Sequence, residues 1–204
     1  MINELRPREP IPQFERTISK LQKLENGEGW PYNAGAMAIA LNAGLVGLVS
    51  NSYFRRMLKV RKLLVFTSLP MAVLPALSIT PAWVMLISKP LVEGSLRCDI
   101  CAQMRGVALN FTFGLIYPSI IAMPLVASIA LRHKTVEVPE MKFSKAAINA
   151  QMKFWVQKSR FFKSQFISLA LFQCVAGMYI AHKQYAVALE YVHKPKWKSM
   201  EELH

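Results

Sequence analysis

The stretch 33–54 reads NAGAMAIALNAGLVGLVSNSYF and contains no Lys, Arg, Asp or Glu. A helix on the surface of a soluble protein keeps a polar face, on which charged residues recur about every turn. No such recurrence exists here, and the length matches the roughly 20 residues needed to cross a hydrocarbon core of about 30 Å. Three more charge-free stretches follow, 63–87, 106–131 and 164–181. The sequence therefore predicts an all-α membrane protein, a bundle of about four transmembrane helices.

Composition supports this class over two others. The chain has 204 residues, 53% of them hydrophobic, and a formal net charge of +13. Four buried helices of a soluble protein would need a polar shell that a chain of this length can hardly supply. Nucleic-acid binding is the usual suggestion for so basic a chain, but the basic residues flank the spans and no RNA- or DNA-binding motif accompanies them. We expect no nucleic-acid partner and contact with anionic lipid such as cardiolipin instead.

The chain divides into a polar N-terminal segment 1–32, a membrane domain 33–182 and a polar C-terminal tail 183–204. The first segment has no apolar core, which argues against a cleavable secretory signal, and five Glu residues argue against a cleavable mitochondrial presequence. Any targeting information is therefore expected to be internal. Phe14, Ile18, Leu21 and Leu24 recur at helical spacing and predict a short amphipathic helix on the surface, ending near 26–27.

The second span is rich in proline, and two paths through the membrane are open to it. It contains Pro70, Pro75 and Pro81, and each proline removes a backbone donor from a helix. We expect a kinked or broken helix, and a re-entrant path is the alternative. A re-entrant path would change the number of crossings.

Small residues and side-chain amides recur in the spans at intervals typical of helix packing in lipid. Small residues let two backbones approach closely, and amides form hydrogen bonds between helices. The polar groups expected at depth also include Asn51 and Gln173, and Gln173, Gly177 and Ala181 share one side of the last span. The residues assigned to helix packing are Asn42, Gly44, Gly47, Asn110, Gly114 and Pro118.

Basic residues concentrate in the hinge 55–62 and the loop 132–163, which together hold thirteen Lys and Arg against two Glu. Apolar residues Ile148, Met152, Trp155 and Phe162 share a helical face of that loop. They predict a helix lying in the membrane interface or, as the alternative, packed on a partner protein. The positive-inside rule places the hinge and this loop on one face and both termini on the other. Residues assigned to membrane-surface or partner contact are Arg55, Arg56, Lys145, Lys153 and Arg160.

Cys98 and Cys101 form the chain's Cys-x-x-Cys pair, in the loop between the second and third spans. Thioredoxin-like activity would require the pair at a helix N-terminus in a βαβ setting, and a structural zinc site would require about four ligands. A local disulfide is the favoured interpretation, provided that the loop faces an oxidising compartment. Nothing in the sequence identifies catalytic, cofactor-binding or metal-binding residues, so we expect no enzymatic activity and no cofactor.

Several motifs resemble the transmembrane protein 126 family, in order along roughly residues 30–185. The first span and its hinge, LNAGLVGLVSNSYFRR at 41–56, are similar to those of the family. LPMAVLP at 69–75 resembles its second span, and GLIYP at 114–118 with Pro124 resembles its third. Cys98-Asp99-Ile100-Cys101 followed by Arg105-Gly106 is similar to its Cys-x-x-Cys loop. The N-terminal segment and the tail depart from this pattern.

The resemblance implies a multi-pass protein of the mitochondrial inner membrane that assists assembly of respiratory complex I. Implied partners are membrane-arm subunits of complex I and two matrix assembly factors, an acyl-CoA dehydrogenase-like factor and the ECSIT protein. The hinge 55–62 and the loop 132–163 would then face the matrix, and both termini and the 88–105 loop the intermembrane space. Two alternatives stay open: an accessory subunit of mature complex I, or a small inner-membrane transporter or channel subunit.

Overall fold

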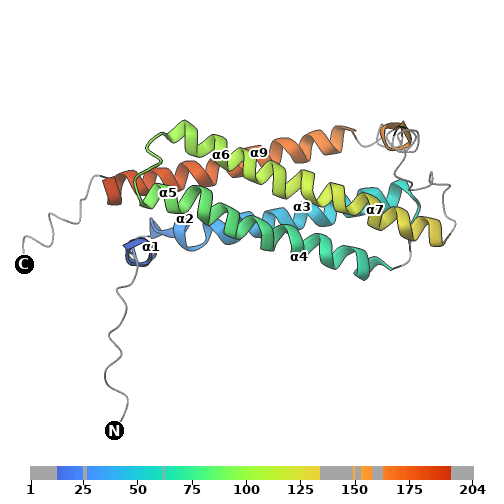
Figure 1. Cartoon of the computed structure of the whole chain (residues 1–204), viewed down its shortest axis with the longest axis horizontal. Helices are drawn as coiled ribbons and strands as arrows, with labels where there is room; N and C mark the ends of the chain where they lie inside the picture. Colours follow the sequence, from blue (N-terminus) through green and yellow to red (C-terminus); the bar gives the residue numbers. More distant parts are fainter. Residues whose placement is uncertain are drawn as a thin grey trace, which may run out of the picture.

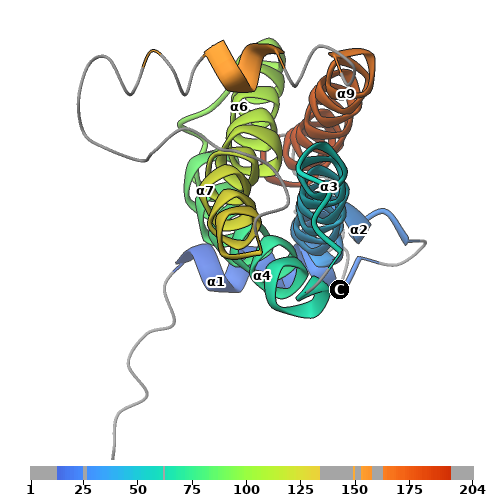
Figure 2. The ribbon, with the colours of Figure 1, turned by 90° about the vertical axis from the view of Figure 1, so that its right-hand side faces the viewer.

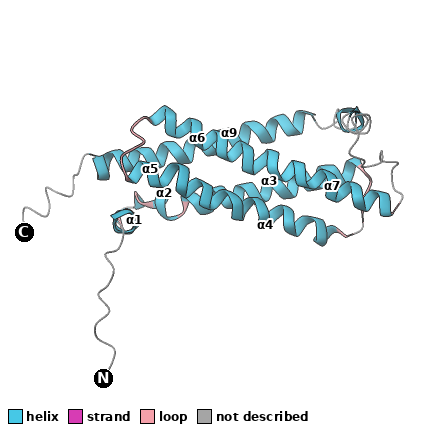
Figure 3. Ribbon diagram, in the orientation of Figure 1, coloured by secondary structure: helices cyan, strands magenta, loops and turns pink. Residues whose placement is uncertain are grey.

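The computed structural model describes residues 13–24, 27–61, 63–133, 149, 153–157 and 163–193, and the described part is almost entirely helical (Figure 3). The elements in chain order are α1 (Gln13–Gln22), α2 (Trp30–Asn33), α3 (Gly35–Met57), α4 (Leu64–Trp83), η2 (Val84–Ser88), α5 (Lys89–Val92), α6 (Asp99–Phe111), η3 (Thr112–Ile116), α7 (Tyr117–Arg132), α9 (Lys163–Ala188) and η5 (Leu189–His193). The three η elements are π-helical segments that continue the neighbouring α-helices without a break.

The predicted bundle of four spans is confirmed. Four helices are long and apolar enough to cross a membrane: Gly35–Met57, Leu64–Val92, Asp99–Arg132 and Lys163–Val192. They run side by side along the long axis, and α1 and the end of α9 lie at the same end of the bundle (Figure 1). We call the other end, where α3 and α7 finish and α4 and α9 begin, the hinge end. An even number of crossings follows from this arrangement.

The second span crosses the bundle without turning back, so the re-entrant alternative is wrong. Residues Leu64–Val92 form one helix despite three internal prolines, about 43 Å long at 1.5 Å per residue. Pro75 cannot donate to the carbonyl oxygen of Met71, four residues earlier. That oxygen instead lies over Gly47 of α3, where no side chain intervenes. A neighbouring helix thus covers one carbonyl that proline leaves unpaired, as is usual for prolines in membrane helices.

Three spans extend well beyond their predicted boundaries, and the second continues to Val92 instead of ending at 87. The third begins at Asp99 instead of 106, and the fourth continues to Ala188 and then through η5. Residues 183–193, expected to belong to the polar tail, are therefore helical. The hydrocarbon core sets only the minimum length of a span, and the fourth span continues where α2 and α5 pack against α9.

The amphipathic helix α1 packs across one end of the bundle. Leu21 is buried there, and Phe14, Ile18 and Leu24 pack against the same core as Leu91 and Val92. This core continues along α3, α4 and α9, and a second core at the hinge end gathers Phe54 and Met71 with the buried face of α7. Large apolar side chains are also exposed along all four spans, as expected of surfaces that face lipid.

The third span passes from one neighbour to another along its length. Its first half, α6, packs against α9, whereas its second half, α7, packs chiefly against α3 and α4 (Figure 2). The change occurs at η3 and Pro118, where regular α-helical hydrogen bonding is interrupted; Pro124, further along α7, is another such position. The divergence leaves a lateral space between α7 and the start of α9.

Candidate functional site

A buried glutamine joins the second and fourth spans and α2 near one end of the bundle. Gln184 of α9 accepts hydrogen bonds from Trp83 Nε1 (3.1 Å) and Ser88 Oγ (3.2 Å) and donates to the Pro31 carbonyl (2.8 Å). The Tyr32 hydroxyl donates to the backbone oxygen of Gln184 at 3.1 Å. Burial raises the pKa of the Tyr32 hydroxyl, which keeps this donor protonated.

This cluster is not among the sequence predictions, because residue 184 was assigned to the tail. A signal for it exists in the sequence. The row Gln173, Gly177 and Ala181, already placed on one side of the last span, continues at the same helical spacing to Gln184 and Ala188. All five are buried in the structure.

Three predicted amides meet in the middle of the bundle. Asn42 of α3 donates to Gln173 Oε1, and Asn110 of α6 donates to the same oxygen (2.9 Å) and to the backbone oxygen of Gln173 (2.7 Å). Gly114 provides the room, because a Cβ there would overlap the Gln173 amide. Pro118 is buried one turn further along. The arrangement ties three spans together with neutral groups.

The glycines assigned to helix packing approach the backbone of the neighbouring span closely. A Cβ on Gly44 would lie 2.8 Å from the Ala72 carbonyl oxygen, and one on Gly47 would overlap the Met71 oxygen. Gly106 and Gly177 form a similar close approach between α6 and α9, since a Cβ on Gly106 would lie 2.5 Å from the Gly177 oxygen. Approaches this close stabilise helix pairs in lipid through packing.

The assignment of Arg55 to the outer surface is wrong. The residue is only 6% exposed, and its guanidinium donates to Thr67 Oγ1 at 3.0 Å. Thr67 also accepts from Asn51 (3.2 Å), so Arg55 and Asn51 fasten α3 to the start of α4. The tight connection between α3 and α4 folds this arginine back over the next span. Arg56 beside it is exposed and stays available for contact.

The charges differ between the two ends of the bundle. The described residues of the hinge end hold seven basic side chains and no acidic one: Arg55, Arg56, Lys59, Arg61, Arg132, Lys153 and Lys163. All described acidic residues lie at the opposite end: Glu15, Glu28, Glu93, Asp99 and Glu190. The hinge end therefore presents a one-sided positive surface to the membrane interface.

Only a short part of the predicted interfacial helix lies within the described residues. Residues 153–157 are helical and are seen end-on in Figure 1, crosswise to the bundle. Trp155 packs edge-on against Phe54 of α3, with ring centroids 5.7 Å apart, and Lys153 is exposed. Lys145, Ile148, Met152, Arg160 and Phe162 lie outside the described residues.

Cys98 and Cys101 are joined by a disulfide, with Cα atoms 5.2 Å apart. Cys98 caps α6 through its sulfur, which accepts from the Cys101 amide at 3.2 Å. The pair does stand at a helix N-terminus, but no strand occurs among the described residues to complete a thioredoxin-like setting. Beside it, His182 Nδ1 lies 3.0 Å from Asp99 Oδ1, which links α6 to α9 at the surface.

The disulfide makes a simple prediction about cysteine reactivity. Protein denatured without reductant should take up one alkylating group, at Cys174, and three after reduction, as read by intact mass. Cys98→Ser should raise the unreduced count to two, because Cys101 then lacks its partner. Three labels without reductant would show that the pair is reduced in the membrane.

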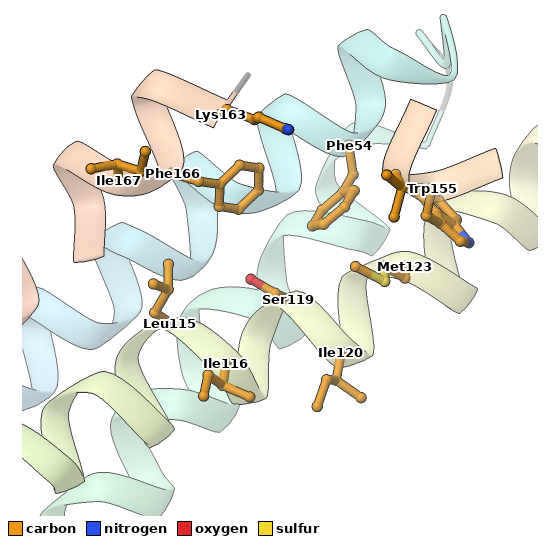
Figure 4. A pocket seen from close by; sticks show the side chains of 11 residues that line it. Phe54, Leu115, Ile116, Ser119, Ile120, Met123, Trp155, Lys163, Phe166 and Ile167 are labelled. Carbon is orange, nitrogen blue, oxygen red and sulfur yellow. The ribbon is translucent and has the colours of Figure 1, made fainter. Parts of the chain in front are cut away.

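A groove opens laterally between α7, α9 and the segment 153–157, with a volume of about 560 Å³ (Figure 4). Its lining is apolar except for Lys163 and Ser119: Phe54, Leu115, Ile116, Ile120, Met123, Trp155, Val156, Phe166 and Ile167. A second groove of about 480 Å³ runs between α3 and α9 and has no charged residue in its lining. Within the described residues, no group of three His, Cys, Asp or Glu is placed to hold a metal ion.

These features define a multi-pass α-helical membrane protein whose buried polar groups join its own spans. The chain belongs to the transmembrane protein 126 family, whose sequence model matches residues 12–198. It is 29% identical to transmembrane protein 126A of Rattus norvegicus over 87% of both chains. It is 29% identical to the Homo sapiens protein of that name, over 88% of this chain and 82% of the relative. Transmembrane protein 126 of Drosophila melanogaster is 30% identical over 56% of this chain and 52% of its own. No solved structure matches.

Proposed function

We propose that this protein is a non-enzymatic scaffold of the mitochondrial inner membrane that assists assembly of respiratory complex I (NADH:ubiquinone oxidoreductase). It holds membrane-arm subunits during assembly and recruits matrix factors, namely the acyl-CoA dehydrogenase-like factor and the ECSIT protein. Anionic lipids such as cardiolipin surround its basic end. The proposal rests on what the family resemblance implies, together with the way the bundle distributes its polar and apolar groups.

One observation favours a scaffold over a transporter or channel subunit. The deepest polar side chains, Asn42, Asn110 and Gln173, bond to one another and fill the centre of the bundle. The close approaches at Gly47 and Gly106 leave little room for a path between the helices. In contrast, the outer faces carry large exposed apolar side chains and two grooves. Such a bundle is suited to lateral contact with other hydrophobic helices.

The proposed orientation assigns the hinge end to the matrix. The described residues of each end include seven Lys and Arg, but those of the hinge end have no acidic neighbour, whereas the opposite end also holds five acidic residues. This excess of positive charge supports the matrix side for the hinge end. The opposite end carries the disulfide, as expected of the intermembrane space. Migration of the tagged chain with partial complex I, and its absence from active complex I, would support the scaffold. Migration with the active enzyme would favour an accessory subunit, and transport by purified protein in liposomes would favour a transporter.

Reversing charge in the 132–163 loop should weaken recruitment of the matrix factors without affecting insertion of the protein into the membrane. For Lys153→Glu combined with Arg160→Glu, we expect recovery of the matrix factors in affinity purification to fall at least about fivefold, because rim charges govern encounter with a partner. The matched control combines Lys89→Glu with Lys183→Glu. It makes the same change in net charge at the opposite end and should leave recovery of the matrix factors unchanged. Equal recovery with both pairs would remove this loop as the docking element.

A further inference from the structure

The lateral groove at the hinge end lies at the depth of the lipid headgroup boundary. Gln173 contacts Gly114, close to the middle of the third span Asp99–Arg132. Lys163 lies ten residues from Gln173 along α9, which is about 15 Å toward the hinge end. Half of a hydrocarbon core of about 30 Å is the same distance. With Gln173 at the midplane of the bilayer, the start of α9 at Lys163 lies at the edge of the hydrocarbon core, next to the headgroup region, and the rest of the groove lies within the hydrocarbon region.

The groove has one charged residue at its edge and an apolar lining below it. Lys163 lies at this edge, and Figure 4 shows its side chain extending toward Phe54 across the opening. Met123 and Ile120 line the groove with apolar surface near the hinge end, and Ile116 does so further into the bundle. The Ser119 Oγ between them is buried and has no hydrogen-bond partner among the described residues. A single cation at the edge of an apolar groove matches a phosphate above an acyl chain.

Charge favours a lipid over a partner helix as the occupant. The groove volume of about 560 Å³ lies in the range of ordinary ligand pockets, which is room for part of a lipid molecule with the remainder in the bilayer. No described residue of the hinge end is acidic, so the positive potential at the opening favours an anionic headgroup.

We propose that this groove binds one anionic glycerophospholipid, with its phosphate at Lys163 and an acyl chain along Ile116, Ile120 and Ile167. Trp155 and Phe166 flank the chain near the headgroup, where aromatic side chains are favoured. This site adds to the proposed function the place where the anionic lipid binds. It rests on the proposed function only for the identity of the membrane, the mitochondrial inner membrane. It also accounts for the divergence of α7 from α9, between which no other described helix lies.

The test uses the purified full-length protein and phosphatidylglycerol or phosphatidylcholine of equal chain length, with retained lipid counted by native mass spectrometry. We expect one phosphatidylglycerol per chain and weaker retention of phosphatidylcholine. Lys163→Gln should weaken phosphatidylglycerol about fivefold, which corresponds to about 1 kcal/mol for one cation near the surface. Ile120→Trp, which narrows the groove, should weaken both lipids.

Two matched variants control for general effects. Lys183→Gln removes a cation at the opposite end, and Leu45→Trp enlarges a side chain in the uncharged groove between α3 and α9; neither should change retention. Equal binding of the two lipids, or equal effects of Lys163→Gln and Lys183→Gln, would overturn the site. So would a photo-crosslinker at position 167 that captures protein instead of lipid in native membranes. The lipid assay contains no complex I component, so its failure would leave the scaffold proposal standing, and the reverse also holds.

Discussion

Replacing Gly47 with leucine should destabilise the bundle by about 3 kcal/mol or more, the upper part of the range for overpacked cores. Any Cβ at this position overlaps the carbonyl oxygen of Met71, which is backbone and cannot rotate away. That oxygen is available because Pro75 offers it no hydrogen-bond donor. The backbone of Gly47 packs directly against it, so leucine would both push α3 from α4 and remove this packing.

The measurement is unfolding in detergent micelles, followed by helical circular dichroism during titration with sodium dodecyl sulfate. Gly47→Ala should fall between the wild type and Gly47→Leu, because the overlap begins at Cβ. Ala38→Leu is the matched control on the same helix; Ala38 is exposed, and the change should stay within about 0.5 kcal/mol. If Gly47→Leu were as stable as Ala38→Leu, the close approach of α3 and α4 would be contradicted.

The number of spans could be predicted from the sequence because a hydrocarbon core imposes a length and a charge rule on every crossing. The amides Asn42, Asn110 and Gln173 were predictable as interhelical contacts, since few polar side chains occur within those stretches. Their meeting at one point depends on how three helices rotate and slide against each other. That geometry is set by packing between the helices and cannot be predicted from the periodicity of any single span.

The ends of the helices and the π-helical segments were not predictable in the same way. Gln184 lies beyond the hydrophobic stretch, where the charge rule no longer applies, and only its tertiary partners show that it is buried. The assignment of Arg55 to the surface was wrong for a related reason. An arginine at the end of a span usually faces headgroups. Here the next helix begins after a short connection, and Thr67 of that helix accepts a hydrogen bond from the arginine.

The two buried glutamines of α9 each lie against a π-helical segment of another span. Ser88 of η2 donates to Gln184, and Gly114 of η3 lies against the Gln173 amide. A π-helical segment adds a residue to a turn and shifts the faces that follow it. In both spans the shift accompanies a contact with a polar side chain that regular α-helical phasing would place differently. A prediction from sequence periodicity assumes a constant number of residues per turn. It therefore could not predict these contacts between the glutamines and the π-helical segments.

The second large effect is expected for Gln184→Leu, which should lower stability by about 2–3 kcal/mol. Leucine preserves approximate volume but removes every hydrogen bond that the Gln184 side chain makes, while the bond from the Tyr32 hydroxyl to the backbone oxygen of residue 184 remains. The Trp83 indole, the Ser88 hydroxyl and the Pro31 carbonyl would each lose a partner in a buried setting. Hydrogen bonds between membrane helices contribute about 0.6 kcal/mol on average and up to about 1.7, so three lost together account for the estimate.

The same titration, with detergent and protein concentration held constant, measures this effect against two other glutamines of α9. Gln165 is exposed, so Gln165→Leu should be nearly neutral and reports the cost of changing residue type alone. Gln173→Leu should fall between them, because the Gln173 Nε2 has no partner among the described residues and less is lost. The expected order of destabilisation is therefore Gln184, Gln173, Gln165. A Gln184→Leu protein as stable as Gln165→Leu would show that α9 is held by packing alone, and that the cluster fixes the register of its end without contributing to stability.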